Sequence, residues 1–132
     1  MNIFIKISSV FLLLLVFFVA VPVFAAEIRL DVHKSEISCG EEFLMDIVIH
    51  TDESLNAIEG QLIFPTDKLL VKEIRDGNSI INFWVEKPRI EASGFILFSG
   101  ITPGGFSGAS NNIFSVVFEA KNIGVASVAL QN

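Results

Sequence analysis

The feature that most constrains how this chain folds is a hydrophobic alternation with a period of two. Successive side chains of a β-strand point to opposite faces of the sheet, so alternating apolar and polar residues indicate strands with one buried face. The pattern recurs in eight short segments: residues 27–34, 41–51, 57–64, 69–74, 81–87, 94–100, 112–121 and 125–131. Outside an N-terminal apolar run, no stretch of ten or more residues has the spacing of an amphipathic helix. The chain is therefore predicted to be all-β.

Turn-forming residues separate these segments about every ten residues. Pro65 ends the third segment because proline cannot donate a hydrogen bond to a neighbouring strand, Asp76-Gly77 forms a turn pair, and Pro88 is expected to close the fifth segment. Eight short strands with regular turns are typical of a β-sandwich, in which two sheets pack face to face.

The alternation also predicts which side chains form the core. The inward positions are expected to be Phe43, Met45, Ile47, Ile49, Gly60, Leu62, Phe64, Phe114, Val116, Phe118 and Ala120. Residues 94–100 are apolar on both faces, with Phe95 and Leu97 on one side and Ile96 and Phe98 on the other. That composition suits a central strand whose outer face is also covered, by a loop or by a partner.

The glycine-rich stretch that follows, "GITPGGFSG" at residues 100–108, raises the question of a phosphate-binding loop. A loop of the Walker type needs a Lys and a Ser or Thr after its last Gly, at the start of a helix. Here Gly108 is followed by Ala-Ser-Asn-Asn and a predicted strand, and no Lys occurs between Lys87 and Lys121. The stretch is therefore predicted to be a surface loop between the sixth and seventh strands.

The first 25 residues have the layout of a secretory signal peptide. A basic residue at Lys6 precedes the apolar run 7–21, and Val23-Phe24-Ala25 supplies small residues at a cleavage site. The run is short for a membrane span, which needs about 20 residues. We therefore predict residues 1–25 as the signal and residues 26–132 as one domain. Contact with a membrane is expected only through the signal segment, if it is not cleaved.

The charge of the chain argues against one class of partner, and its cysteine content limits disulfide formation. The chain carries nine basic and 15 acidic residues, and cleavage would remove one basic and no acidic residue. This acidic balance argues against nucleic acid as a partner. Cys39 is the single cysteine, so no disulfide can form within the chain. An unpaired cysteine of an exported protein is either a buried small hydrophobe or a reactive thiol, and we expect burial.

Neither catalysis nor metal binding has a convincing signature. The acidic pairs Glu41-Glu42 and Asp52-Glu53 suggest the two carboxylates of a glycosidase, but adjacent strand residues point to opposite faces. His33 and His50 belong to no Cys/His/Asp cluster with zinc-ligand spacing, and no loop has an EF-hand pattern. We predict no enzyme activity and no cofactor.

The succession of these pieces resembles a cohesin domain. The matching pieces are "EIRLDV", then "CGEEFLMDIVI", "NAIEGQLIFPTDKLLV", "GFILFSG" with the glycine-rich stretch that follows it, and "NIFSVVFEAKNIGVASVAL". Together they cover nearly all of residues 27–130, and their order and spacing carry the likeness. The resemblance implies a jelly-roll β-sandwich of eight to nine strands, a fold shared with carbohydrate-binding modules. Cohesins usually continue into a further strand, so either the sequence is a fragment or the domain closes differently.

The resemblance also implies a binding face. Cohesins are extracellular modules that bind dockerin domains and build cellulosomes and other cell-surface assemblies, and the calcium of such pairs belongs to the dockerin. The family's acidic contact falls on Glu59, with Gln61 pointing the same way, and its strand-six contacts fall on Leu97 and Phe95. Trp84 is a further candidate on the fifth strand. A nearby family Glu falls on Gly100, so that contact is missing here.

The resulting prediction is a secreted, non-catalytic module that binds a dockerin-like protein, in assemblies linked to polysaccharide degradation. The alternatives are a carbohydrate-binding module on the same fold and a structural or adhesive envelope domain. Direct sugar binding usually needs an exposed strip of Trp and Tyr, whereas this chain has one Trp and no Tyr. For Glu59 and Trp84 the plainer interpretations are a solvated strand residue and a tryptophan at the edge of the core.

Overall fold

A computed structural model describes residues 26–131, all in strands, turns and irregular segments. The predicted signal peptide, residues 1–25, lies outside the described residues. The six strands are β1 (Glu27–Val32), β2 (Glu42–Ile63), β3 (Leu69–Arg75), β4 (Phe83–Glu91), β5 (Phe95–Ala120) and β6 (Ala129–Gln131). In this part of the chain there is no helix with the length and apolar character to cross a membrane.

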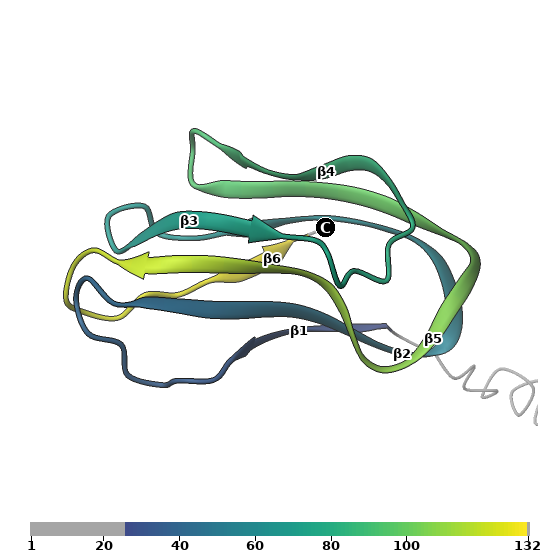
Figure 1. Ribbon diagram of the computed structural model, residues 1–132, viewed down its shortest axis with the longest axis horizontal. Helices are drawn as coiled ribbons and strands as arrows, with labels where there is room; N and C mark the ends of the chain where they lie inside the picture. The colour runs from purple at the N-terminus through teal and green to yellow at the C-terminus, as the bar shows by residue number, and fades with distance from the viewer. Residues whose placement is uncertain (1–25, 132) are drawn as a thin grey trace, which may run out of the picture.

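The strands form two antiparallel layers because β2 and β5 are long enough to run through both (Figure 1). In layer one, the first part of β2 lies between β1 and the last part of β5, and β5 also pairs with β3. In layer two, the last part of β2 lies between β6 and the first part of β5, and β5 also pairs with β4. Each layer thus has four strand segments, which confirms the predicted sandwich and accounts for the eight predicted segments.

The two long strands correct the prediction of a glycine-rich surface loop. Residues 101–111 continue β5 instead of leaving the sheet, and they pair with β2 at Leu55–Phe106 and Thr51–Gly108. The pairing shifts register several times between residues 47 and 57 of β2, which is how an antiparallel pair bends. Gly104, Gly105 and Gly108 have positive φ, so the glycines let the strand turn from one layer to the other.

The strand β4 also runs further than predicted. Pro88 was expected to close it, but β4 continues through Pro88 to Glu91. The register shifts between Glu86 and Arg89, so Pro88 sits within an irregular stretch, and β4 pairs with β5 on one side only. A proline is tolerated at such a place because an edge strand can spare a hydrogen-bond donor.

The core fills the space between the layers, and the predicted alternation is confirmed there. Ile47, Leu62, Ile96, Phe114, Val116 and Phe118 are fully buried. Phe118 stacks on Phe43 with ring centroids 5.7 Å apart and meets Phe64 edge to face at 5.4 Å. Phe98 and Phe114 form a second edge-to-face pair across the layers, at 5.0 Å.

The prediction of a buried Cys39 is wrong. Cys39 is exposed, in the turn that leads into β2, and its thiol donates to the carbonyl of Lys121 at 3.0 Å. The turn is fixed next to it by Gly40, which has a φ of 83° and donates to the carbonyl of Ala120 at 2.7 Å. The backbone of this turn follows the surface, so its side chains do not reach the core.

Candidate protein-binding face

The outer side of layer two brings four of the five predicted site residues together. In an antiparallel pair, residues directly opposite each other project to the same side of the sheet. Glu59 lies opposite Ser99, Gln61 opposite Leu97, and Ile63 opposite Phe95. The intervening residues, such as Leu62, Ile96 and Phe98, point into the core. Glu59, Gln61, Phe95 and Leu97 therefore form neighbouring rows on one surface, here called the layer-two face.

The strand β4 extends this face on the far side of β5. Glu91 lies opposite Phe95, Arg89 opposite Leu97, and Glu86 opposite Ser99. On the other edge, β6 adds Gln131, whose side-chain oxygen accepts a hydrogen bond from Gln61 at 3.2 Å. No further strand of residues 26–131 packs over this side. The face is thus an open surface across four strands.

Trp84 does not join the other four. It lies opposite Gly100, on the inward side of β4, and packs half-buried against the core. A Cβ added to Gly100 would meet side-chain atoms of Ile81 and Trp84, so the absence of a side chain at Gly100 makes room for the indole. The plainer interpretation of Trp84, a core-edge position, matches this placement.

Sequence reasoning missed the residue next to it. Phe83 projects outward, opposite Ile101, and the two are 59% and 37% exposed. They add an apolar row to the face beside the row of Glu59 and Glu86. The signal that could have found Phe83 is the alternation itself, but in "FWV" three large apolar residues follow one another and the direction of each is ambiguous.

Charges on the face are arranged around one guanidinium. Arg89 donates from Nε to Glu91 at 2.8 Å and also pairs with Glu86 through Nη1. The hydrogen bond from Arg89 to Glu91 raises the pKa of the guanidinium, and the charge of Glu86 raises it further. Glu59 is exposed and adds a further carboxylate in the row of Glu86. The face therefore combines apolar side chains with an excess of negative charge.

The described part of the chain has no group of three or more His, Cys, Asp or Glu residues placed to hold a metal ion. The chemistry that the layer-two face offers is that of association. Exposed phenyl and aliphatic groups exclude water against a partner, while carboxylates accept hydrogen bonds from its donors.

Comparison with known proteins identifies the fold. A type II cohesin domain from the cellulosome of Acetivibrio cellulolyticus, 13% identical, matches with a TM-score of 0.65 over 82% of this chain and 75% of that chain. The sixth cohesin of scaffoldin B from the same organism, solved in complex with a dockerin, is 12% identical, with a TM-score of 0.62 over 80% and 82% of the two chains. A type II cohesin–X–dockerin complex of that organism is 11% identical, with a TM-score of 0.58 over 82% and 78%.

No family model matches the sequence, and neither does any curated protein. At identities this low the likeness is one of fold. The structural match nonetheless extends over about four fifths of the chain. The protein therefore has the fold of cohesin domains.

Proposed function

We propose that this protein is a secreted, non-catalytic module that binds a dockerin-like protein partner through the layer-two face. The observation that carries the proposal is the register of β2, β5 and β4. It assembles an apolar and acidic surface on the fold of proteins that have been solved in complex with dockerins. The negative charge of the face favours a partner whose docking surface is basic around an apolar centre.

The same likeness supports the proposed location. The similar structures include a cohesin domain from a cellulosome. Together with the predicted signal peptide, this supports a place outside the cell or at its surface, in an assembly linked to polysaccharide degradation.

Binding measurements on a defined panel test the proposal. Dockerins from the Acetivibrio cellulolyticus complexes, together with dockerins of other types, are titrated calorimetrically with the protein, with calcium and then with chelator. We expect at least one dockerin to bind in the presence of calcium. The variant Leu97→Asp places a charge at the centre of the face and should weaken that binding by about 30-fold or more, the loss typical of a hot-spot residue. Glu59→Ala should weaken it by a smaller factor.

The matched control is Arg75→Gln, on the outer side of layer one, which should bind as the wild type does. An equal loss of dockerin binding in Leu97→Asp and in Arg75→Gln would contradict binding through the layer-two face. Failure of every dockerin would leave the fold in place and favour a structural role for the domain.

A further inference from the structure

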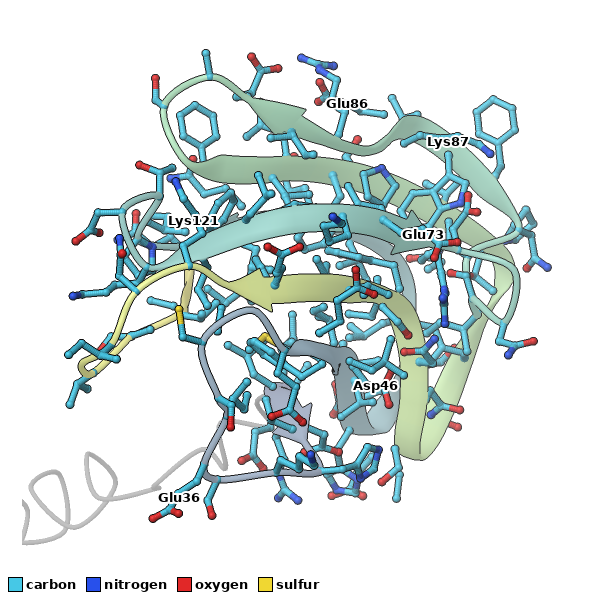
Figure 2. All side chains as sticks on the ribbon, turned by 60° about the vertical axis from the view of Figure 1, so that its left-hand side comes forward. Glu36, Asp46, Glu73, Glu86, Lys87 and Lys121 are labelled. Carbon is cyan, nitrogen blue, oxygen red and sulfur yellow. The ribbon has the colours of Figure 1, made fainter. Side chains whose placement is uncertain are left out.

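The outer side of layer one, opposite the layer-two face, is hollowed into a trough. Its main part encloses about 770 Å³ and is lined by polar side chains, which include Asp46, Arg75, Asp76, Asn78, Asn112 and Ser115. A second hollow of about 190 Å³ continues it and shares Val48 and Ser110 with it. In Figure 2, Glu86 lies at the upper edge of the molecule by β4, and Asp46 lies toward the opposite edge.

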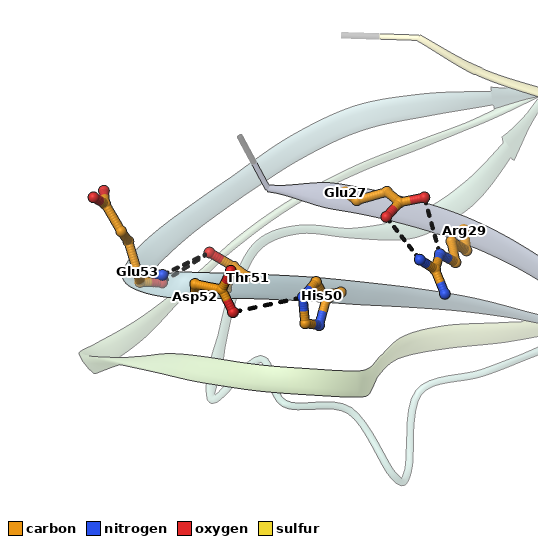
Figure 3. A network of polar contacts seen from close by, with 6 residues as sticks. All are labelled: Glu27, Arg29, His50, Thr51, Asp52 and Glu53. Atoms are coloured by element: carbon orange, nitrogen blue, oxygen red, sulfur yellow. Dashed lines mark hydrogen bonds and ion pairs between the residues drawn. The ribbon is translucent and has the colours of Figure 1, made fainter. Parts of the chain in front are cut away.

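The trough crosses the strands instead of following them. Asp46, Ser115 and Arg75 lie directly opposite one another on β2, β5 and β3, so they form one polar row across the layer. The smaller hollow carries the trough on to Arg29 and His50, at the β1 side of the layer. Figure 3 shows these two side chains on β1 and β2. Because neighbouring strands lie about 4.8 Å apart, four strands give a length of roughly 14 Å.

The walls are held in place by the chain itself. The turn at residues 76–78 is tied by the bond from Ser79 N–H to the carbonyl of Asp76, at 3.2 Å, and by the ion pair of Asp76 with Lys87, at 3.0 Å. The side chains of Val48 and Ser115 point outward from the sheet, yet they are only 9% and 6% exposed. They form a floor that lies below the surrounding surface, so the trough exists before any ligand arrives.

The polar groups of the floor are oriented by one another. The Ser115 hydroxyl donates to Asp46 Oδ1 at 2.6 Å. In the amide orientation that pairs both of its polar atoms, Asn112 donates to the backbone carbonyls of Phe114 and Ile47, at 3.2 and 3.3 Å. Arg75 uses Nε and Nη2 to hold Glu73, and its side chain lines the trough. Polar groups that hold one another in place thus lie beside the apolar side chain of Val48, a combination that suits hydroxyl groups and C–H faces together.

Charge and backbone pairing decide the class of ligand. The main part of the trough has three carboxylates, those of Asp46, Glu73 and Asp76, against two cations, Arg75 and the Lys87 that pairs with Asp76, so the balance still disfavours an anion. An extended peptide usually adds to a free sheet edge, but the floor belongs to β2 and β5, which have strands on both sides. A neutral chain of hydroxyl-bearing rings needs no backbone edge and meets side-chain groups only.

We propose that the layer-one trough binds a segment of a neutral polysaccharide, as a single chain crossing the strands. The site is separate from the layer-two face and does not depend on the proposed protein partner. It needs no platform of Trp and Tyr, because the ligand is held in a polar trough instead of being stacked on a flat surface. Without aromatic stacking the binding is weak, and we expect millimolar dissociation constants, about −4 kcal/mol.

The test is a titration of the isotope-labelled protein, followed by amide chemical shifts in NMR spectra. The probes are soluble hexamers of β-linked glucose, xylose, mannose and N-acetylglucosamine, with an oligogalacturonate as the anionic comparison. We expect saturable shift changes at trough residues for at least one neutral hexamer, and none there for the oligogalacturonate. Asn78→Ala and Arg75→Gln should each weaken binding by about five-fold, the value of one hydrogen bond.

The matched control is Arg89→Gln, which removes an ion-paired and similarly exposed guanidinium from the layer-two face and should leave sugar binding unchanged. The amide spectrum of each variant shows whether it has folded. Absence of shift changes with every neutral hexamer would overturn the proposal, and so would changes that map to the layer-two face. Stronger binding of the anionic oligomer, or of an extended peptide added as a further probe, would also overturn it.

Discussion

At the scale of single residues, the alternation of the strands decides which phenylalanines stabilise the fold. Phe118 is fully buried and contacts the rings of Phe43 and Phe64, whereas Phe83 is 59% exposed. We expect Phe118→Ala to lower the free energy of unfolding by about 3–5 kcal/mol, because it removes buried surface and leaves a cavity. Phe83→Ala should change it by about 0.5 kcal/mol or less. Urea denaturation measures the free energy of unfolding of both variants. Similar losses of stability would contradict the inward direction of Phe118 and the outward direction of Phe83.

Protonation of one glutamate is expected to influence stability in acid. Glu41 accepts hydrogen bonds from the Lys34 ammonium and from the backbone N–H of Ser38, the latter at 3.0 Å. These bonds, chiefly that of Lys34, lower the pKa of Glu41 below its ordinary value of 4.5. Since the folded-state pKa is lower than the unfolded one, the contribution to stability is present above pH 4.5 and is lost as the pH falls through the lowered pKa.

The corresponding measurement is the urea midpoint from neutral pH downward, for the wild type and for Glu41→Gln. The variant should be less stable at neutral pH and should lose less stability on acidification. The control is Glu36→Gln, since Glu36 has no ion-pair partner within residues 26–131. A Glu41→Gln profile parallel to that of the wild type would show that the bonds contribute nothing in solution.

At the scale of elements, the bend of β5 determines whether the two layers can face each other. Gly105 lies in this bend with a φ of 75°, and a Cβ there would collide with Ser54 on β2. We expect Gly105→Ala to destabilise the protein by more than about 1 kcal/mol, because a residue with a Cβ is strained at this positive φ, while the Ser54 hydroxyl can rotate away.

Gly77 is the control for this prediction, because it lies in open space without a positive φ. Gly77→Ala should be neutral or stabilise the fold by up to about 1 kcal/mol, since alanine restricts the unfolded chain. Thermal unfolding followed by circular dichroism compares the two variants, and an equal effect on both would mean that the bend tolerates a side chain.

At the scale of the whole molecule, the shared strands should make the two layers unfold together. β2 and β5 each run through both layers, so neither layer keeps its central strands if the other opens. Trp84 is the single tryptophan and packs in layer two, so its fluorescence reports that layer. We expect the fluorescence midpoint in urea to coincide with that of circular dichroism, as in a two-state transition. An earlier fluorescence transition would show that layer two opens independently.

The two outer faces give the molecule two different surfaces. The layer-two face is apolar with paired charges, and the layer-one trough is polar and lined by a row of residues from three strands. Both depend on register, because a shift of one residue would turn their side chains into the core.

The sequence by itself determined the class of the fold, the number of strand segments and the inward set from Met45 to Phe118, because alternation is a local property of a strand. The resemblance to cohesins, and not the alternation, selected Glu59, Gln61, Phe95 and Leu97 as outward residues. Only the tertiary structure decided the rest. The glycines of residues 100–108 suggested a surface loop, but they lie in a continuous strand and let it bend. Pairing with β2 keeps this segment in the sheet. Trp84 turns inward because Gly100 leaves it space. The polar trough brings together residues from three strands, since pairing over long sequence separations has no local signal.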